Sequence, residues 1–167
     1  EIYTLSLHDA LPDLATAAGT TISISTTAPA AHTVAGFDGI AAGSWRVIGA
    51  VVNSGGFPRA MREFDDIRLL DGSALVIAQS ETMDAMEVEA VYQPGDTGKQ
   101  AVAAASNGKT IVWFKWQLPS GAKVYCAGYV TGYGPSAETS GDYVGVSFTI
   151  KPIFDAAGAG VIISPAV

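Results

Sequence analysis

The chain has 167 residues and a formal net charge of −7, with 49% hydrophobic and only 15% charged residues. This length suits one domain with a sizeable core, and the acidic balance argues against a nucleic-acid wrapper, which needs Lys and Arg to neutralise phosphates. A single cysteine, Cys126, excludes an internal disulfide framework, and no apolar run reaches the roughly 20 residues of a membrane-spanning helix. A composition this apolar, with so few charged residues, indicates that a partner covers part of the surface of the protein.

The first twelve residues, EIYTLSLHDALP, resemble the translation of a widely used sequencing adapter. Under this interpretation residues 1–12 are a non-native leader, are excluded from fold reasoning, and give His8 no function. The alternative is a short N-terminal helix with a weak apolar face. We expect a single β domain over residues 13–155, followed by a C-terminal arm or tail over residues 156–167.

The next segments predict strands separated by loops. Residues 21–26 alternate apolar and polar side chains, which is typical of a half-buried strand. Residues 28–43 are rich in Pro, Gly and Ala and predict a loop, whereas residues 45–52 predict another strand. Residues 52–66 show no clear periodicity, so we expect a long irregular loop there. Asp71-Gly72 lies between two apolar runs and predicts a hairpin.

Residues 83–92 alternate again. Met86, Val88, Ala90 and Tyr92 are predicted to share the core face, with the acidic Glu87 and Glu89 on the other face. A helix over about residues 97–107 follows. Thr97 is its expected N-cap, with Gln100 three residues on as in a capping box, and Asn107-Gly108 supplies a stop. A helix this short must pack on the sheet to be stable.

Three strands are expected over residues 111–118, 123–131 and 143–153. Their alternation places Trp113, Tyr125 and Tyr129 on faces opposite to the apolar sets. Aromatic side chains on the outer face of a sheet indicate that this face is buried against another subunit. The many short strands with turns between them indicate a mainly β fold, either a β-sandwich or a barrel-like sheet.

Candidate catalytic residues are few. His32 lies in a Pro/Ala loop, where a solvated histidine is favoured over a triad with a distant Ser and Asp. Cys126 lies in mid-strand, which favours a small buried hydrophobe over a nucleophile. Glu87 and Glu89 lie along one strand and indicate an acidic stripe more than the opposed carboxylates of a glycosidase. The sequence therefore predicts no catalytic, cofactor or metal site, and no enzyme.

The order of these elements, together with three short motifs, resembles the tail tube (major tail) proteins of long-tailed bacteriophages. The motifs are D-x-G-x-x-A over residues 96–101, LPSG over residues 118–121, and GYVTGYGP over residues 128–135. The resemblance covers roughly residues 19–152. It implies a β-sandwich or barrel-like core with one short helix packed on it.

The resemblance also implies a structural role. Tail tube proteins form hexameric rings that stack into a hollow tube, which conducts the genome and the tape-measure protein. The implied partners are copies of the chain, the tape-measure protein and a tail terminator or adaptor, with DNA passing without specific binding. The implied location is the virion tail, with the host cytoplasm during assembly.

Within this hypothesis, Glu87 and Glu89 are the candidate lumen-facing residues, because an acidic lumen repels phosphate. The candidate ring-to-ring contact is the stretch over residues 52–66, with Phe57, Arg59, Arg62 and Asp65 as its site residues. Two alternatives stay open. One is a related secretion-tube or head–tail adaptor subunit, and the other is a carbohydrate-binding β-sandwich that uses exposed tryptophans.

Overall fold

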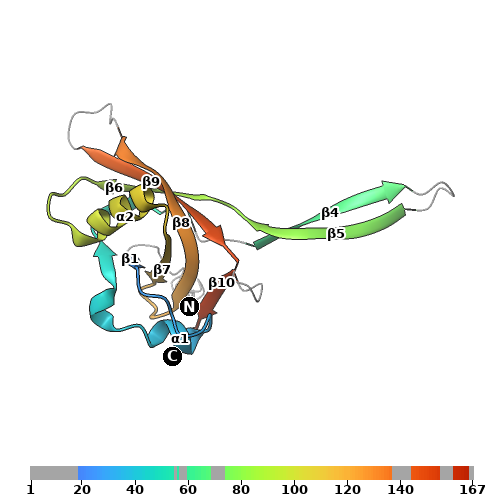
Figure 1. Cartoon of the computed structure of the whole chain (residues 1–167), viewed down its shortest axis with the longest axis horizontal. Helices are drawn as coiled ribbons and strands as arrows, with labels where there is room; N and C mark the ends of the chain where they lie inside the picture. Colours follow the sequence, from blue (N-terminus) through green and yellow to red (C-terminus); the bar gives the residue numbers. More distant parts are fainter. Residues whose placement is uncertain are drawn as a thin grey trace, which may run out of the picture.

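In the computed structural model, one rolled antiparallel sheet carries most of the chain, and a long hairpin projects from it (Figure 1). The structure describes residues 19–54, 56, 60–68, 74–136, 144–154 and 160–165. Within these residues the strands are β1 (Thr21–Ser25), β2 (Arg46–Ile48), β3 (Val51–Asn53), β4 (Ala60–Arg68), β5 (Ala74–Met83), β6 (Met86–Val91), β7 (Ile111–Gln117), β8 (Lys123–Ser136), β9 (Gly145–Ile153) and β10 (Val161–Ser164). The helices are α1 (Val34–Asp38), α2 (Thr97–Gly108) and the 3₁₀ turn η1 (Ala42–Ser44).

The sheet is rolled because its two ends are joined by a very short connection. Its strand order is β2-β1-β7-β8-β9-β6-β3, yet β2 and β3 are separated in sequence only by Gly49 and Ala50. Three residue steps bring Ile48 within about 11 Å of Val51, so the first and last strands must lie close together. The prediction of one strand over residues 45–52 is therefore wrong. Ala50 breaks it with a left-handed φ of 48°.

The inside of the roll is the hydrophobic core. The alternating apolar sets predicted for β6 and β7 are confirmed, since Met86, Val88 and Ala90 are buried, as are Val112, Phe114 and Trp116. Tyr92 was expected on the same face but is 51% exposed, because it lies beyond the end of β6. The mainly β, barrel-like fold class is thus confirmed, with strand ends that protrude from the core.

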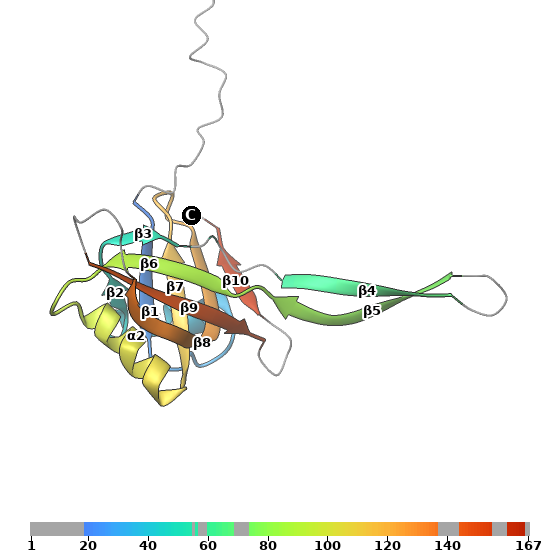
Figure 2. The same ribbon diagram turned by 90° about the horizontal axis from the view of Figure 1, so that it is seen from above.

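Helix α2 packs against the roll, as Figure 2 shows. It presents Ala101, Val102 and Ala105 to the sheet and contacts β1, β2 and β8. The helix predicted over residues 97–107 is confirmed, but its N-cap is wrong by one residue. Asp96 is the cap, because its carboxylate accepts a hydrogen bond from the Lys99 amide at 3.0 Å. Thr97 is instead the first helical residue.

Helix α1 interrupts the segment predicted as a loop over residues 28–43. Thr33 caps it by accepting a hydrogen bond from the Gly36 amide. Phe37 of this helix stacks on Tyr125 of β8, with ring centroids 4.8 Å apart, and both side chains are buried. The outer aromatic face at Tyr125 is therefore covered by the chain itself, contrary to the expectation that another subunit covers it. Trp113 packs partly buried against the same cluster.

Strands β4 and β5 form a hairpin that extends away from the sheet (Figure 2). With nine residues in β4, the ribbon is about 30 Å long. The irregular loop expected over residues 52–66 is wrong, because β3 and β4 occupy most of that range. The predicted hairpin is confirmed by its two flanking strands, whereas Asp71 and Gly72 lie outside the described residues. A projecting ribbon has no core face, so it does not require the alternation that predicts a strand.

Strand β10 lies in the C-terminal segment that was expected to be an arm or tail. It pairs antiparallel with β8, from Val161 opposite Cys126 to Ser164 opposite Lys123. On the same side of β8, strand β9 pairs from Ala127 onward. β10 therefore pairs with the first part of this edge of β8, and β9 pairs with the rest of it.

Candidate functional site

The candidate catalytic residues lie on separate elements, with His32 before α1, Cys126 in β8, and Glu87 and Glu89 in β6. Among the described residues, no group of three or more His, Cys, Asp or Glu side chains is placed to hold a metal ion. Cys126 is completely buried, and burial raises the pKa of its thiol, which disfavours the reactive thiolate. His32 is half-buried with its ring 5.2 Å from that of Phe37, so it is not the solvated loop histidine expected. No helix in the described part of the chain has the length and apolar character to cross a membrane.

Glu87 and Glu89 lie on the face of β6 that points away from the core. Glu87 is exposed and Glu89 is half-buried. In the sheet register, Glu87 lies opposite Thr149 of β9 and Glu89 lies opposite Ser147. Directly opposed residues of antiparallel strands share a face, so the acidic pair belongs to a polar outer surface that β9 continues.

The four residues predicted for the ring-to-ring contact fall in two places. Phe57 and Arg59 lie outside the described residues. Arg62 and Asp65 lie in β4, in register with Glu81 and Ile77 of β5. The structure thus places two of them on the projecting hairpin instead of on an irregular loop.

Large apolar side chains remain exposed in several places on the sheet. The most exposed are Val47, Val52, Tyr92, Ile111, Val144 and Ile163. The Tyr92 amide donates to the Val144 carbonyl at 2.7 Å, so these two lie side by side at one end of β6 and β9. A groove of about 370 Å³ opens near the other end of β9, lined by Ile111, Trp113 and Ile153 among others. The Tyr92–Val144 pair and this groove are candidate contact surfaces, because contiguous exposed apolar patches mark interaction sites.

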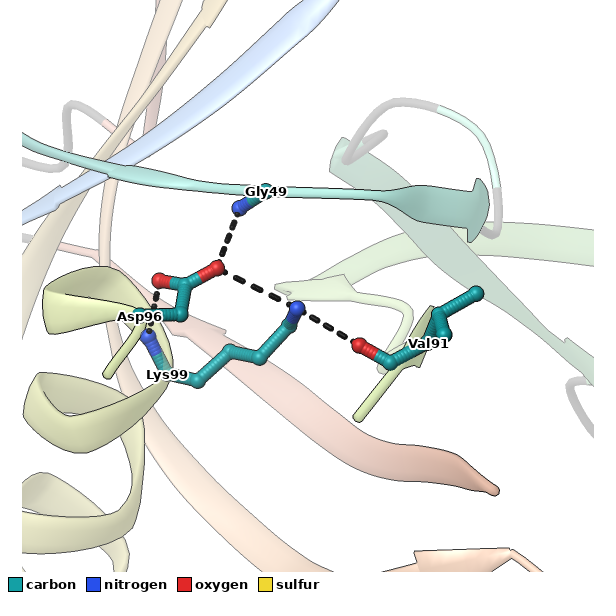
Figure 3. A network of polar contacts seen from close by, with 4 residues as sticks. All are labelled: Gly49, Val91, Asp96 and Lys99. Carbon is teal, nitrogen blue, oxygen red and sulfur yellow. Dashed lines mark hydrogen bonds and ion pairs between the residues drawn. The ribbon is translucent and has the colours of Figure 1, made fainter. Parts of the chain in front are cut away.

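A buried polar network holds the rolled sheet closed (Figure 3). One Asp96 oxygen, Oδ2, accepts from the Gly49 amide at 2.8 Å and lies 3.1 Å from the Lys99 ammonium. That ammonium also donates to the Val91 carbonyl at 2.6 Å. The network therefore ties the start of α2 to the turn between β2 and β3 and to the end of β6.

The surroundings of Asp96 favour its ionised form. Burial of the carboxyl raises its pKa, but the hydrogen bonds from the amides of Lys99 and Gly49, together with the Lys99 ammonium, hold it below the ordinary 3.8. Asp96 stood in the D-x-G-x-x-A motif, but its sequence neighbours gave no indication of its partner 47 residues away. The sequence therefore did not predict this contact, and the role of Asp96 in it is structural.

A second carboxylate joins α1 to β8. Asp38 accepts hydrogen bonds from the Lys123 ammonium at 2.7 Å and from the Tyr125 hydroxyl at 2.6 Å. These hydrogen bonds, from Lys123 first and then from Tyr125, hold the pKa of Asp38 below its ordinary value. In both networks the charged side chains join elements that are far apart in the sequence.

The sequence matches no protein-family model and no curated protein. Solved structures do resemble the fold. A chain of the anti-feeding prophage tube-terminating cap matches with a TM-score of 0.55 at 8% identity, over 98% of this chain and 97% of its own. A chain of the sheath/tube terminator of an extracellular contractile injection system, PVC, in its extended state matches with a TM-score of 0.53 at 10% identity, over 96% and 100%. The chain has a tail-tube-like fold.

A third match is a chain of the six-fold symmetrised anti-feeding prophage baseplate, with a TM-score of 0.53 at 8% identity, over 79% of this chain and 87% of that one. Identities this low establish the shared fold alone.

Proposed function

We propose that the chain is a structural subunit of a phage-like tail, which assembles with copies of itself into rings that stack into a hollow tube for genome delivery. The observation that carries this proposal is the tail-tube-like fold, matched over nearly the whole chain. The exposed apolar side chains support it, because a ring subunit buries such surface against its neighbours. The proposed location is the virion tail, after assembly in the host cytoplasm.

In this proposal the rings are hexameric, as the six-fold symmetry of the similar baseplate structure favours. The tape-measure protein and a terminator or adaptor are the other proposed partners. Glu87 and Glu89 face the lumen. Their polar outer surface, continued by Ser147 and Thr149, gives DNA a wall that repels phosphate and offers it no basic contact at these positions.

The proposed ring-to-ring contact is the β4–β5 hairpin, which carries Arg62 and Asp65. Its length of about 30 Å is that of a whole domain of small size, so it spans the distance to an adjacent ring. Such a ribbon is only marginally stable by itself. Its pairing partner in an assembled tube would be the surface of a neighbouring subunit.

A terminator is the second candidate function, and a specific observation favours it. Two similar structures that cover nearly the whole chain are a tube-terminating cap and a sheath/tube terminator. A terminator closes the end of a tube, so it would form a single ring and not extend by itself.

Negative-stain electron microscopy of the purified chain, with and without residues 1–12, tests the proposal. Tubes about 10 nm wide, the rough width of a hexamer of domains this size, are the expected result. Single rings that never stack would favour the terminator. Monomers at every concentration, combined with glycan binding, would contradict both and favour the carbohydrate-binding alternative.

A further inference from the structure

Two connections join the hairpin to the rolled sheet. On one side β3 ends at Asn53 and β4 begins at Ala60, and on the other β5 ends at Met83 and β6 begins at Met86. The β4–β5 ladder and the β3–β6 ladder are therefore separate in the described residues. A two-stranded ribbon joined in this way is free to swing unless its base is packed against something.

The base of the hairpin packs on a glycine. A Cβ atom placed on Gly160 would lie 2.8 Å from both Cε and Sδ of Met83, and 2.8 Å from Cε1 of Phe154. Gly160 is buried, while Met83 and Phe154 are half-buried. The side chains of the last residue of β5 and of the residue after β9 thus pack directly on Gly160, and a larger residue there would force one of them to move.

Gly160 and Phe154 are themselves held by the sheet. Phe154 directly follows Ile153, which lies opposite Ala127 of β8, and Gly160 directly precedes Val161, which lies opposite Cys126. Both pairings are on the same side of β8, at adjacent residues. Figures 1 and 2 both show β10 beside the base of the hairpin.

We infer that Met83, Phe154 and Gly160 form a seat that sets the direction of the hairpin, and that the seat couples this direction to the docking of β10 on β8. If β10 leaves β8, Gly160 moves and Met83 loses its packing. Coupling of this kind is reciprocal. A neighbouring subunit that holds the hairpin in this direction therefore also stabilises β10, a consequence for ring stacking that rests on the proposed function.

Pulsed electron paramagnetic resonance on the isolated subunit tests the seat. Spin labels are attached at Ala74→Cys in β5 and at Ala104→Cys on the exposed side of α2, while the buried Cys126 stays unlabelled. The parent protein should give one narrow distance distribution. Met83→Ala removes packing atoms only, and it should broaden the distribution. Gly160→Val should shift the distribution, because the new side chain displaces Met83.

Two further variants control for unspecific effects. Gly134→Val adds the same side chain in β8 where nothing lies within 4 Å, and it should leave the distance unchanged. The pair Gly160→Val with Met83→Ala should come closer to the parent than either single change, because one side chain fills the space that the other vacates. Parent-like distances in both single variants would overturn the seat.

Hydrogen exchange tests the coupling to β10. In Met83→Ala, the amides of β10 should exchange about tenfold faster while those of β1 stay unchanged, as expected for local opening of one element. Unchanged exchange in β10 would overturn the coupling even if the hairpin swings. Both measurements use the unassembled subunit, so they stand apart from microscopy. A parent chain that forms no tubes would count against the proposed function and leave the seat intact.

Discussion

The carboxylate of Asp96 lies 3.1 Å from the ammonium of Lys99, and the two side chains are only 8% and 3% exposed. This pair also binds the Gly49 amide and the Val91 carbonyl, so it joins the helix to both ends of the rolled sheet. A buried pair of this kind is specific in geometry, because each charge needs the other to offset its desolvation. It decides where α2 begins and where the sheet closes.

Removing one partner of this pair should be strongly destabilising. Asp96→Ala leaves the Lys99 charge buried without its counter-ion, and we expect a loss of about 3–5 kcal/mol in the free energy of unfolding. Urea denaturation measures it. Thr97→Ala, at the cap position expected from sequence, should cost less than about 0.5 kcal/mol. Asp96→Ala combined with Lys99→Met should be milder than Asp96→Ala alone. Equal losses for Asp96→Ala and Thr97→Ala would contradict the assigned cap.

The same carboxylate should make stability depend on pH. The pKa of Asp96 is lower in the folded chain than in the unfolded chain, so its contribution is present above about pH 4 and is lost as the pH falls through the folded pKa. Urea titrations from pH 7 down to pH 2 measure the difference between the parent and Asp96→Asn. The gap should be constant near neutrality and shrink in acid. A gap that widens in acid would reverse the assigned direction.

Close packing of α2 on β2 should forbid a side chain at Gly98. A Cβ there would lie only 2.2 Å from the Val47 carbonyl oxygen, so Gly98→Ala must push the helix off the strand. We expect a loss of about 2–3 kcal/mol. Gly108→Ala in the same helix meets only an ordinary contact with Thr110 and should gain up to about 1 kcal/mol. Thermal unfolding separates the two, and a neutral Gly98→Ala would show that α2 is free to shift.

Reversing the acidic pair should affect genome passage without affecting the fold. Glu87→Lys with Glu89→Lys places two cations on the outer face of β6, and in the proposed tube they would bind passing phosphates and slow DNA ejection. The charge-neutral pair Glu87→Gln with Glu89→Gln is the control and should eject DNA nearly normally. Ejection from assembled particles is the measurement. Unchanged ejection by the lysine variant would place this face outside the lumen.

Replacing residues 57–82 with a short Gly/Ser linker, which keeps Met83, should leave a folded subunit that does not form tubes. The hairpin is paired only with itself among the described strands, so the rolled sheet keeps its own ladders. Circular dichroism and sedimentation should report a folded domain, and microscopy should find no filaments. Filaments of normal length would show that the rings stack through another surface.

Local periodicity explains which parts of this fold were predictable. The alternation in β6, β7 and β9 reports burial on one face, and the core residues follow from it. The same rule fails where a strand extends away from the rolled sheet, as β4 does, and where a turn interrupts an apolar run, as at Ala50. Helix α1 was missed because its five residues are too few to show a helical period.

The candidate surfaces divide in the same way. The outward placement of Glu87 and Glu89 followed from a period of two along one strand. The packing of Phe37 on Tyr125 could not be predicted in this way, because Phe37 lies 88 positions earlier in the sequence and contacts Tyr125 only in the folded chain. The pairing of β10 with β8 could not be predicted either, because it depends on the part of the β8 edge that β9 does not pair with.

The sequence by itself determined the mainly β class, the apolar faces of the strands and the position of α2, because each depends on residues within a few positions of one another. Only the tertiary structure decided that the sheet rolls, that Asp96 reaches Gly49, and that Met83 packs on Gly160. The contacts of Asp96 and of Met83 join residues 47 and 77 positions apart, so they depend on hydrogen-bond geometry and close packing that the spacing of residues in the sequence does not report. The low fraction of charged residues, 15% of the chain, is consistent with such packing. It leaves apolar surface that the chain covers in part with α1, and in part exposes.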